Sequence, residues 1–99
     1  MVISKTYATE LFHLSESEST QYVNDMLQVA KALDAVFYPR KLNDELLGNT
    51  VAHLHCHLVP RYDWDPHPKR PIWEHSHTPI IFSPEAYDAR IVAIGQHLS

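Results

Sequence analysis

The chain has 99 residues, of which 44% are hydrophobic and 20% are charged, a composition typical of one small globular domain. Its formal net charge of -4, from 12 acidic residues against 8 lysines and arginines, argues against general nucleic-acid binding, which needs a basic face. The single cysteine cannot form an internal disulfide. Because the sequence shows no signal-peptide pattern and no apolar run approaching the ~20 residues that span a membrane, we expect a cytoplasmic protein with no membrane partner.

The first predicted elements are a short strand and a long helix. Residues 1–5 are apolar and β-branched, and we interpret them as the end of a strand. Ser15 and Glu18 have the spacing of a capping box, which predicts the start of a helix. Apolar residues then recur at three- and four-residue steps, so we expect about six turns of amphipathic helix ending before Pro39. The predicted apolar stripe consists of Tyr22, Val23, Met26, Leu27, Ala30, Leu33, Val36 and Phe37.

Two further strands are predicted in the middle of the chain. Residues 41–47 have the pattern of a strand, and Gly48 with Asn49 predicts a tight turn into residues 51–59. Successive side chains of a strand point to opposite faces. The stretch 51–59 therefore has a packing face, formed by Ala52, Leu54, Cys56 and Leu58, and an opposite face, formed by Val51, His53, His55, His57 and Val59.

Three histidines on one strand face are difficult to explain by packing, because each buried imidazole needs partners for two ring nitrogens. Zinc binding is one alternative, since imidazole is a common zinc ligand. At ~3.3 Å per residue, however, the backbones of His53 and His57 lie ~13 Å apart on a straight strand, so one ion cannot bind all three rings. A row of imidazoles is better suited to an extended anionic substrate. Cys56, on the packing face, is interpreted as an apolar filler rather than a nucleophile.

The remaining third of the chain predicts a long loop and a terminal helix. Residues 60–79 contain five of the seven prolines and both tryptophans. We interpret Trp64 and Trp73 as anchors of this loop on the domain or on a second subunit, and the loop histidines His67, His75 and His77 as solvated. Ser83 followed by Pro84 predicts a helix start. Its predicted apolar stripe is Tyr87, Ile91, Ile94 and Leu98.

These elements predict an α+β fold in one domain, residues 1–99. An antiparallel sheet contains the histidine strand, one long helix packs on its apolar face, and a second helix ends the chain. The short first strand leaves an exposed sheet edge, and such edges are commonly covered by another chain. We therefore expect a homodimer.

The run His53-Leu54-His55-Cys56-His57-Leu58-Val59 resembles the signature of the histidine triad (HIT) superfamily of nucleotide hydrolases and transferases. The flanking sequences Leu42-Asn43-Asp44-Glu45-Leu46-Leu47-Gly48-Asn49, Pro60-Arg61-Tyr62 and Arg70-Pro71-Ile72-Trp73 are similar to a bacterial branch of it, and the resemblance covers nearly the whole chain. It implies that residues 1–5 are the second half of an N-terminal hairpin and that this domain lacks the first strand or strands of the family. Tyr7 stands where a number of relatives carry a histidine.

The resemblance also implies a reaction and its residues. His55 would attack the α-phosphorus of a nucleoside phosphoramidate, a dinucleoside polyphosphate or an adenylylated small molecule, and water would cleave the resulting nucleotidyl-histidine. His57 would assist the leaving group, and His53 would orient the arrangement. No metal or other cofactor takes part. The residues implied in binding the phosphate oxygens are Asn43, Asn49 and Thr50.

Two other functions fit the same residues. One is a nucleotide-binding module that keeps the fold and has weak catalysis. The other is a zinc-binding protein. Nucleotide monophosphate binding without a response to zinc favours a nucleotide site, whereas tight zinc binding without a nucleotide response favours the metal site.

Overall fold

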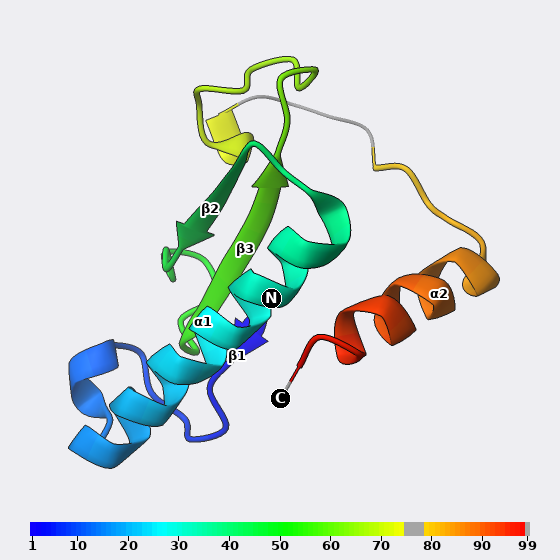
Figure 1. The fold of residues 1–99 in the computed structure, drawn as a ribbon. Coiled ribbons are helices and arrows are strands. Elements are labelled where there is room, and N and C mark those ends of the chain that lie inside the picture. Colours follow the sequence, from blue (N-terminus) through cyan, green and yellow to red (C-terminus); the bar gives the residue numbers. More distant parts are fainter. Residues whose placement is uncertain (75–78, 99) are drawn as a thin grey trace.

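The computed structural model describes residues 1–74 and 79–98. Its strands form one antiparallel sheet in the order β1-β3-β2, and Figure 1 shows α1 crossing one side of this sheet. The second helix, α2, contacts α1. The fold is therefore α+β, as predicted. The elements are β1 (Val2–Ile3), a 3₁₀ helix (Leu11–His13), α1 (Glu16–Phe37), β2 (Lys41–Glu45), β3 (His55–Arg61), a second 3₁₀ helix (Ile72–Glu74) and α2 (Pro84–Gly95).

The helix α1 begins and ends where the sequence predicts. The Ser15 hydroxyl accepts a hydrogen bond from the Glu18 backbone N–H at 3.2 Å, and the Glu18 carboxylate accepts one from the Ser15 N–H at 3.0 Å. The Thr6 hydroxyl donates to the same carboxylate, and this bond, with those from Ser15, holds the pKa of Glu18 below its usual value. At the other end, Tyr38 has a left-handed backbone (φ 48°) that closes the helix before Pro39. The capping box is thus confirmed.

The core lies between α1 and the apolar face of the sheet. Tyr22 of α1 packs against Leu54, and its hydroxyl donates to the Val2 carbonyl at 2.8 Å, so this buried polar group is satisfied. Cys56 and Leu58 of β3 are also buried. The predicted helix stripe is only partly correct, because Val23 and Leu27 are exposed, whereas Ala32, outside that stripe, is 1% exposed. The apolar arc of α1 is wider than the face that this narrow sheet covers.

The segment between β2 and β3 differs from the predicted tight turn. The strand β2 ends at Glu45 and β3 begins at His55, so residues 46–54 form a loop in which Gly48 has φ +73°. The Leu54 backbone explains this difference. Its N–H donates to the Ala8 carbonyl at 2.7 Å, and its carbonyl accepts from the Ser4 N–H at 3.1 Å. This part of the chain follows the N-terminal segment instead of β2, and Ala52, predicted on the packing face, is exposed.

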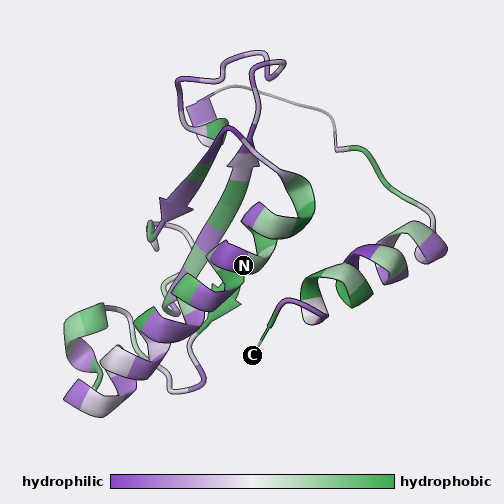
Figure 2. Cartoon of the chain, viewed as in Figure 1, coloured by the Kyte–Doolittle hydropathy of each residue, from purple (hydrophilic) through white to green (hydrophobic). Residues whose placement is uncertain are grey.

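The helix α2 starts as predicted but does not bury its predicted stripe. The Ser83 hydroxyl accepts from the Ala86 N–H at 3.2 Å, with Pro84 in the first turn. Tyr87, Ile91 and Leu98 are nevertheless exposed, Ile91 by 66%. Because α1 already covers the apolar face of the sheet, α2 packs beside α1, and Figure 2 shows apolar residues on its surface and in the segment before it. In the described part of the chain, no helix is long and apolar enough to cross a membrane.

The burial of Cys56 predicts a loss of stability at alkaline pH. The side chain is fully buried, and burial raises the pKa of its thiol. The unfolded chain therefore loses this proton at lower pH than the folded one. The contribution of the buried thiol to the free energy of unfolding is therefore fully present below the unfolded pKa of about 8.5, and it declines as the pH rises through that value. We expect urea denaturation to give free energies of unfolding that fall between about pH 8 and about pH 10, less steeply in Cys56→Ala. An equal slope in that variant would assign the loss to other groups.

Candidate active site

The histidine row lies on the face of β3 opposite α1. His55 and His57 are strand residues, and His53 precedes the strand. All three imidazoles are half-buried, whereas Leu54, Cys56 and Leu58 between and beyond them are buried. The predicted alternation of a histidine face with a packing face is therefore confirmed, although the strand begins later than residue 51.

A backbone carbonyl fixes the tautomer of His55. Its Nδ1 lies 2.7 Å from the His53 carbonyl oxygen. Because a carbonyl can only accept, Nδ1 carries the hydrogen, and the neutral ring then keeps a lone pair on Nε2. The contact comes from the His53 backbone and not from its imidazole. The central ring is thus held with one nitrogen occupied and the other available as a nucleophile.

The His53 ring is anchored on the N-terminal segment. Its Nε2 lies 2.8 Å from the Ser4 carbonyl oxygen, so this nitrogen is the donor. Tyr7 packs edge-on against the same ring, with the ring centroids 5.2 Å apart and the planes at 72°. His53 thereby connects the start of β3 to the chain that follows β1.

His57 lies between two aromatic rings. Its centroid is 5.0 Å from that of His55, with the planes at 87°, and 5.0 Å from that of Trp73, with the planes at 65°. Glu45 faces His57 across the β2–β3 register, and its carboxylate accepts a hydrogen bond from the Trp73 indole N–H. Trp73 therefore anchors its loop on the domain, as predicted for this residue. Trp64 stacks on Tyr62 within the loop, with a centroid distance of 4.9 Å.

The three candidate phosphate ligands have different surroundings. Asn43 shares the histidine face, and its Oδ1 accepts from Arg61 Nη1 at 2.8 Å, which orients the amide and leaves its N–H groups as donors. Asn49 and Thr50 are exposed in the loop 46–54. Within residues 1–74 and 79–98, no side-chain hydrogen bond joins either of them to the histidine row. Gly48 in the same loop lines a cavity of about 230 Å³ that reaches His55.

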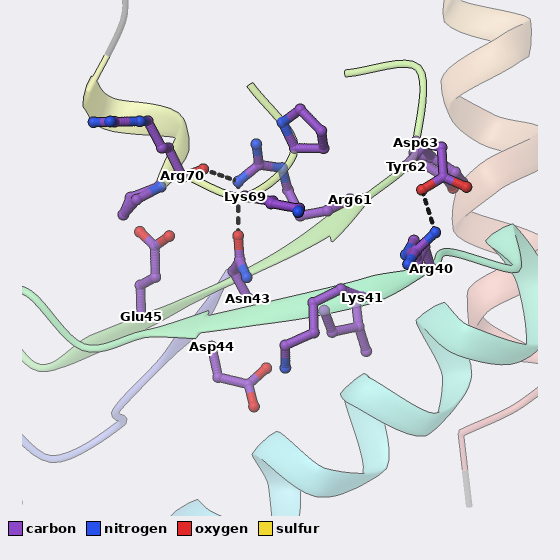
Figure 3. Close-up of a pocket in the computed structure, with 13 residues that line it drawn as sticks. Arg40, Lys41, Asn43, Asp44, Glu45, Arg61, Tyr62, Asp63, Lys69 and Arg70 are labelled. Atoms are coloured by element: carbon purple, nitrogen blue, oxygen red, sulfur yellow. Dashed lines mark hydrogen bonds and ion pairs between the residues drawn. The ribbon is translucent and has the colours of Figure 1, made fainter. Parts of the chain in front are cut away.

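Arg61 is a functional candidate that the sequence analysis missed. It is only 3% exposed, and its guanidinium donates to the side chains of Asn43 and Asp65 and to the carbonyls of His67 and Arg70. Figure 3 shows Arg61 between Asn43 on β2 and the loop that carries Arg70. If the alternation of the two faces is extended two residues beyond Val59, Arg61 falls on the histidine face.

A larger cavity of about 840 Å³ lies along β2 and includes Arg61 in its wall. Lys41, Lys69 and Arg70 line it, together with Glu45, which faces His57. An ion pair between Arg40 and Asp63, with an N–O distance of 2.7 Å, is exposed on the same cavity. Five cationic side chains and three carboxylates thus line a space that adjoins the end of the histidine row.

The described residues contain no group of three or more histidine, cysteine, aspartate or glutamate side chains arranged to hold a metal ion. His75 and His77, interpreted above as solvated loop histidines, lie outside the described residues.

The fold and the histidine row define a class of proteins, in which three alternating histidines line one face of an antiparallel sheet. A comparison with protein families matches residues 1–64 to the HIT domain. The chain therefore belongs to the HIT domain family. It is 31% identical to the "Protein hit" of Bacillus subtilis (strain 168) over 67 residues, which cover 63% of this chain and 46% of that protein. The chain thus spans less than half the length of this curated relative.

Solved structures support the same assignment. A histidine triad protein from Bradyrhizobium japonicum superposes with a TM-score of 0.87 at 27% identity, over 96% of this chain and 70% of that one. A histidine triad protein from Sinorhizobium meliloti 1021 superposes with a TM-score of 0.83 at 26% identity, over 91% of this chain and 66% of that one. A third, from Marinobacter aquaeolei VT8, superposes with a TM-score of 0.78 at 23% identity, over 92% of this chain and 68% of that one. At this identity it supports the fold alone.

Proposed function

We propose that this chain is a nucleotide hydrolase or transferase that acts at an α-phosphate through a nucleotidyl-histidine intermediate. The observation that carries this proposal is the hydrogen bond from His55 Nδ1 to the His53 carbonyl, because it directs the lone pair to Nε2 of a half-buried ring. A neutral ring in this tautomer presents the Nε2 lone pair to phosphorus without first moving its hydrogen from one nitrogen to the other. The family membership supports the same class of reaction.

The proposed reaction has two steps. His55 Nε2 forms a bond to the α-phosphorus while the bond from phosphorus to the leaving group breaks, and His57 donates a proton to the departing atom. Water then attacks the same phosphorus and gives a proton to His57, which restores the proton that His57 donated, while the N–P bond breaks and His55 returns to its neutral form. In a transferase, another hydroxyl or phosphate takes the place of water. This scheme uses no metal, and the substrates are nucleoside phosphoramidates, dinucleoside polyphosphates or adenylylated small molecules.

The negative charge on the phosphoryl oxygens needs hydrogen-bond donors. Asn43 supplies amide N–H groups beside the row, since Arg61 occupies its oxygen. We propose Asn49 and Thr50 as further donors, on the ground that their loop adjoins the cavity reaching His55. Lys41 and Lys69 in the wall of the larger cavity add positive charge next to the site.

We also propose that the chain forms a homodimer. The strand β1 is an edge strand of two residues, and Ile3 on it is exposed. A free strand edge with an apolar side chain is a surface that a second chain can cover. Sedimentation velocity measures the mass directly, and a monomer at all concentrations would exclude this assembly.

The function is tested by incubating the purified chain with an adenosine phosphoramidate and a diadenosine polyphosphate in the presence of a chelator. We expect AMP release from at least one substrate, and its loss in His55→Ala. Binding of AMP without turnover would favour the nucleotide-binding module instead. Calorimetry with zinc provides a separate control, because tight zinc binding without a nucleotide response would favour the metal site.

A further inference from the structure

The contact between Trp73 and His57 brings the loop after β3 onto the histidine row. Trp73 comes sixteen residues after His57 in the chain, yet the centroids of the two rings are 5.0 Å apart. Its indole N–H is bonded to Glu45, which belongs to the neighbouring strand and faces His57. The Trp73 ring is therefore fixed both to β2 and against the imidazole.

A buried guanidinium holds the loop that delivers this tryptophan. Arg61 Nη1 donates to the Arg70 carbonyl at 2.6 Å and Nη2 to the His67 carbonyl at 2.7 Å, while Nε bonds Asp65 at 2.8 Å. Charge-assisted bonds of this kind are stronger than neutral ones, and a planar fork fixes directions that an ammonium cannot. Three anchors therefore fix the chain between residues 65 and 70.

The fixed loop leads directly to Trp73. The Glu74 N–H donates to the Pro71 carbonyl at 3.2 Å, forming the 3₁₀ helix Ile72–Glu74 that contains the tryptophan. Arg70 pairs with Glu74 at 3.3 Å across the same turn. One hydrogen-bonded turn therefore separates the last carbonyl bound by Arg61 from the ring that contacts His57.

We propose that Arg61 and Trp73 are positioning residues for His57, with Arg61 holding the loop and Trp73 holding the imidazole against His55. This proposal rests on the proposed function for its catalytic consequence. A free imidazole rotates about two side-chain torsions, and a proton donor is effective only in the orientation that reaches the departing atom. Loss of either positioning residue leaves the nucleophile in place and makes proton donation less efficient.

The kinetic test uses two substrates with a common AMP group, an alkyl phosphoramidate with a poor leaving group and a p-nitrophenyl ester with a good one. We expect Trp73→Leu to lower kcat for the phosphoramidate by about tenfold, part of the general-acid contribution, with little change for the ester. Arg61→Lys also loosens the Asn43 amide, so we expect it to slow both substrates, the phosphoramidate more than the ester. Trp73→Phe keeps a ring and is expected to retain more activity. Arg40→Lys is the matched control, because Arg40 lies in an exposed ion pair. Equal losses on both substrates would contradict the positioning role.

A second measurement does not depend on turnover. The ring current of Trp73 shifts the imidazole proton resonances of His57, which are assigned with His57→Gln. We expect Trp73→Leu and Arg61→Lys to move these resonances toward their values in an unstructured peptide, and Arg40→Lys to leave them unchanged, in proteins with otherwise native amide spectra. Unchanged resonances in Arg61→Lys would overturn the proposal even if the chain had no hydrolase activity. Shifted resonances in a chain without turnover would overturn the proposed function alone.

Discussion

His55→Ala is expected to abolish the covalent nucleotidyl-enzyme and to lower turnover by more than about a thousandfold, as removal of a nucleophile does in other enzymes. The His55 ring has its Nδ1 hydrogen on the His53 carbonyl and its Nε2 lone pair free, which is the arrangement that attack requires. Its side chain is half-buried on the face away from α1, so its loss does not open the core. Rapid quenching with a substrate labelled in the α-phosphate, followed by mass measurement of the intact chain, detects the adduct.

The matched control is His53→Ala. The tautomer of His55 depends on the backbone carbonyl of residue 53, and that carbonyl remains in the variant. Loss of the His53 ring removes its bond to the Ser4 carbonyl and its contact with Tyr7. We therefore expect His53→Ala to form the adduct, with a smaller loss of turnover than His55→Ala. Adduct formation in His55→Ala would transfer the nucleophile to another residue of the row.

Local periodicity accounts for what the sequence predicts correctly. The capping box at Ser15 and Glu18 involves atoms three residues apart, and the alternation through His55 and His57 follows from the two-residue repeat of a strand. Neither feature needs knowledge of a distant segment. The HIT signature adds the identity of the fold, which the family match and the solved structures confirm.

Long-range hydrogen bonds account for what the sequence does not predict. The loop 46–54 replaces a tight turn because the Leu54 backbone pairs with Ala8 and Ser4, more than forty residues earlier. Arg61 is buried because two carbonyls and two side chains converge on its guanidinium. No spacing rule predicts that these four acceptors lie around one side chain, although a buried guanidinium requires hydrogen-bond partners of this kind.

The face that a helix buries also depends on its neighbour. The apolar pattern of α2 is that of an amphipathic helix, but it does not show whether the helix meets the sheet or α1. Because α1 covers the sheet, Ile91 remains exposed in the single chain. Similarly, the resemblance implies that Asn49 and Thr50 bind phosphate, while their contacts depend on the path of the loop 46–54, which the hydrogen bonds of Leu54 to Ala8 and Ser4 determine.

His57→Ala is expected to slow substrates according to how much their leaving groups need a proton. For an alkyl phosphoramidate, loss of a general acid costs about 10²–10⁴ in rate, because the departing nitrogen is a strong base. A p-nitrophenolate leaves without protonation, so the p-nitrophenyl ester is expected to lose less than about tenfold. The measurement is kcat for a series of AMP derivatives, plotted against the pKa of the leaving group.

The slope of that plot distinguishes proton donation from general damage to the site. His57 touches both His55 and Trp73, so its removal also leaves space between two rings. A packing defect would disturb the attack of His55 on every substrate and lower all rates equally, with an unchanged slope. Loss of the proton donor makes kcat depend more steeply on the pKa of the leaving group. His57→Gln offers a hydrogen bond without a transferable proton, so its slope is expected to lie between those of the unmodified chain and His57→Ala. A parallel shift of the whole series would show that His57 acts only through its packing against His55 and that the leaving group takes its proton from solvent.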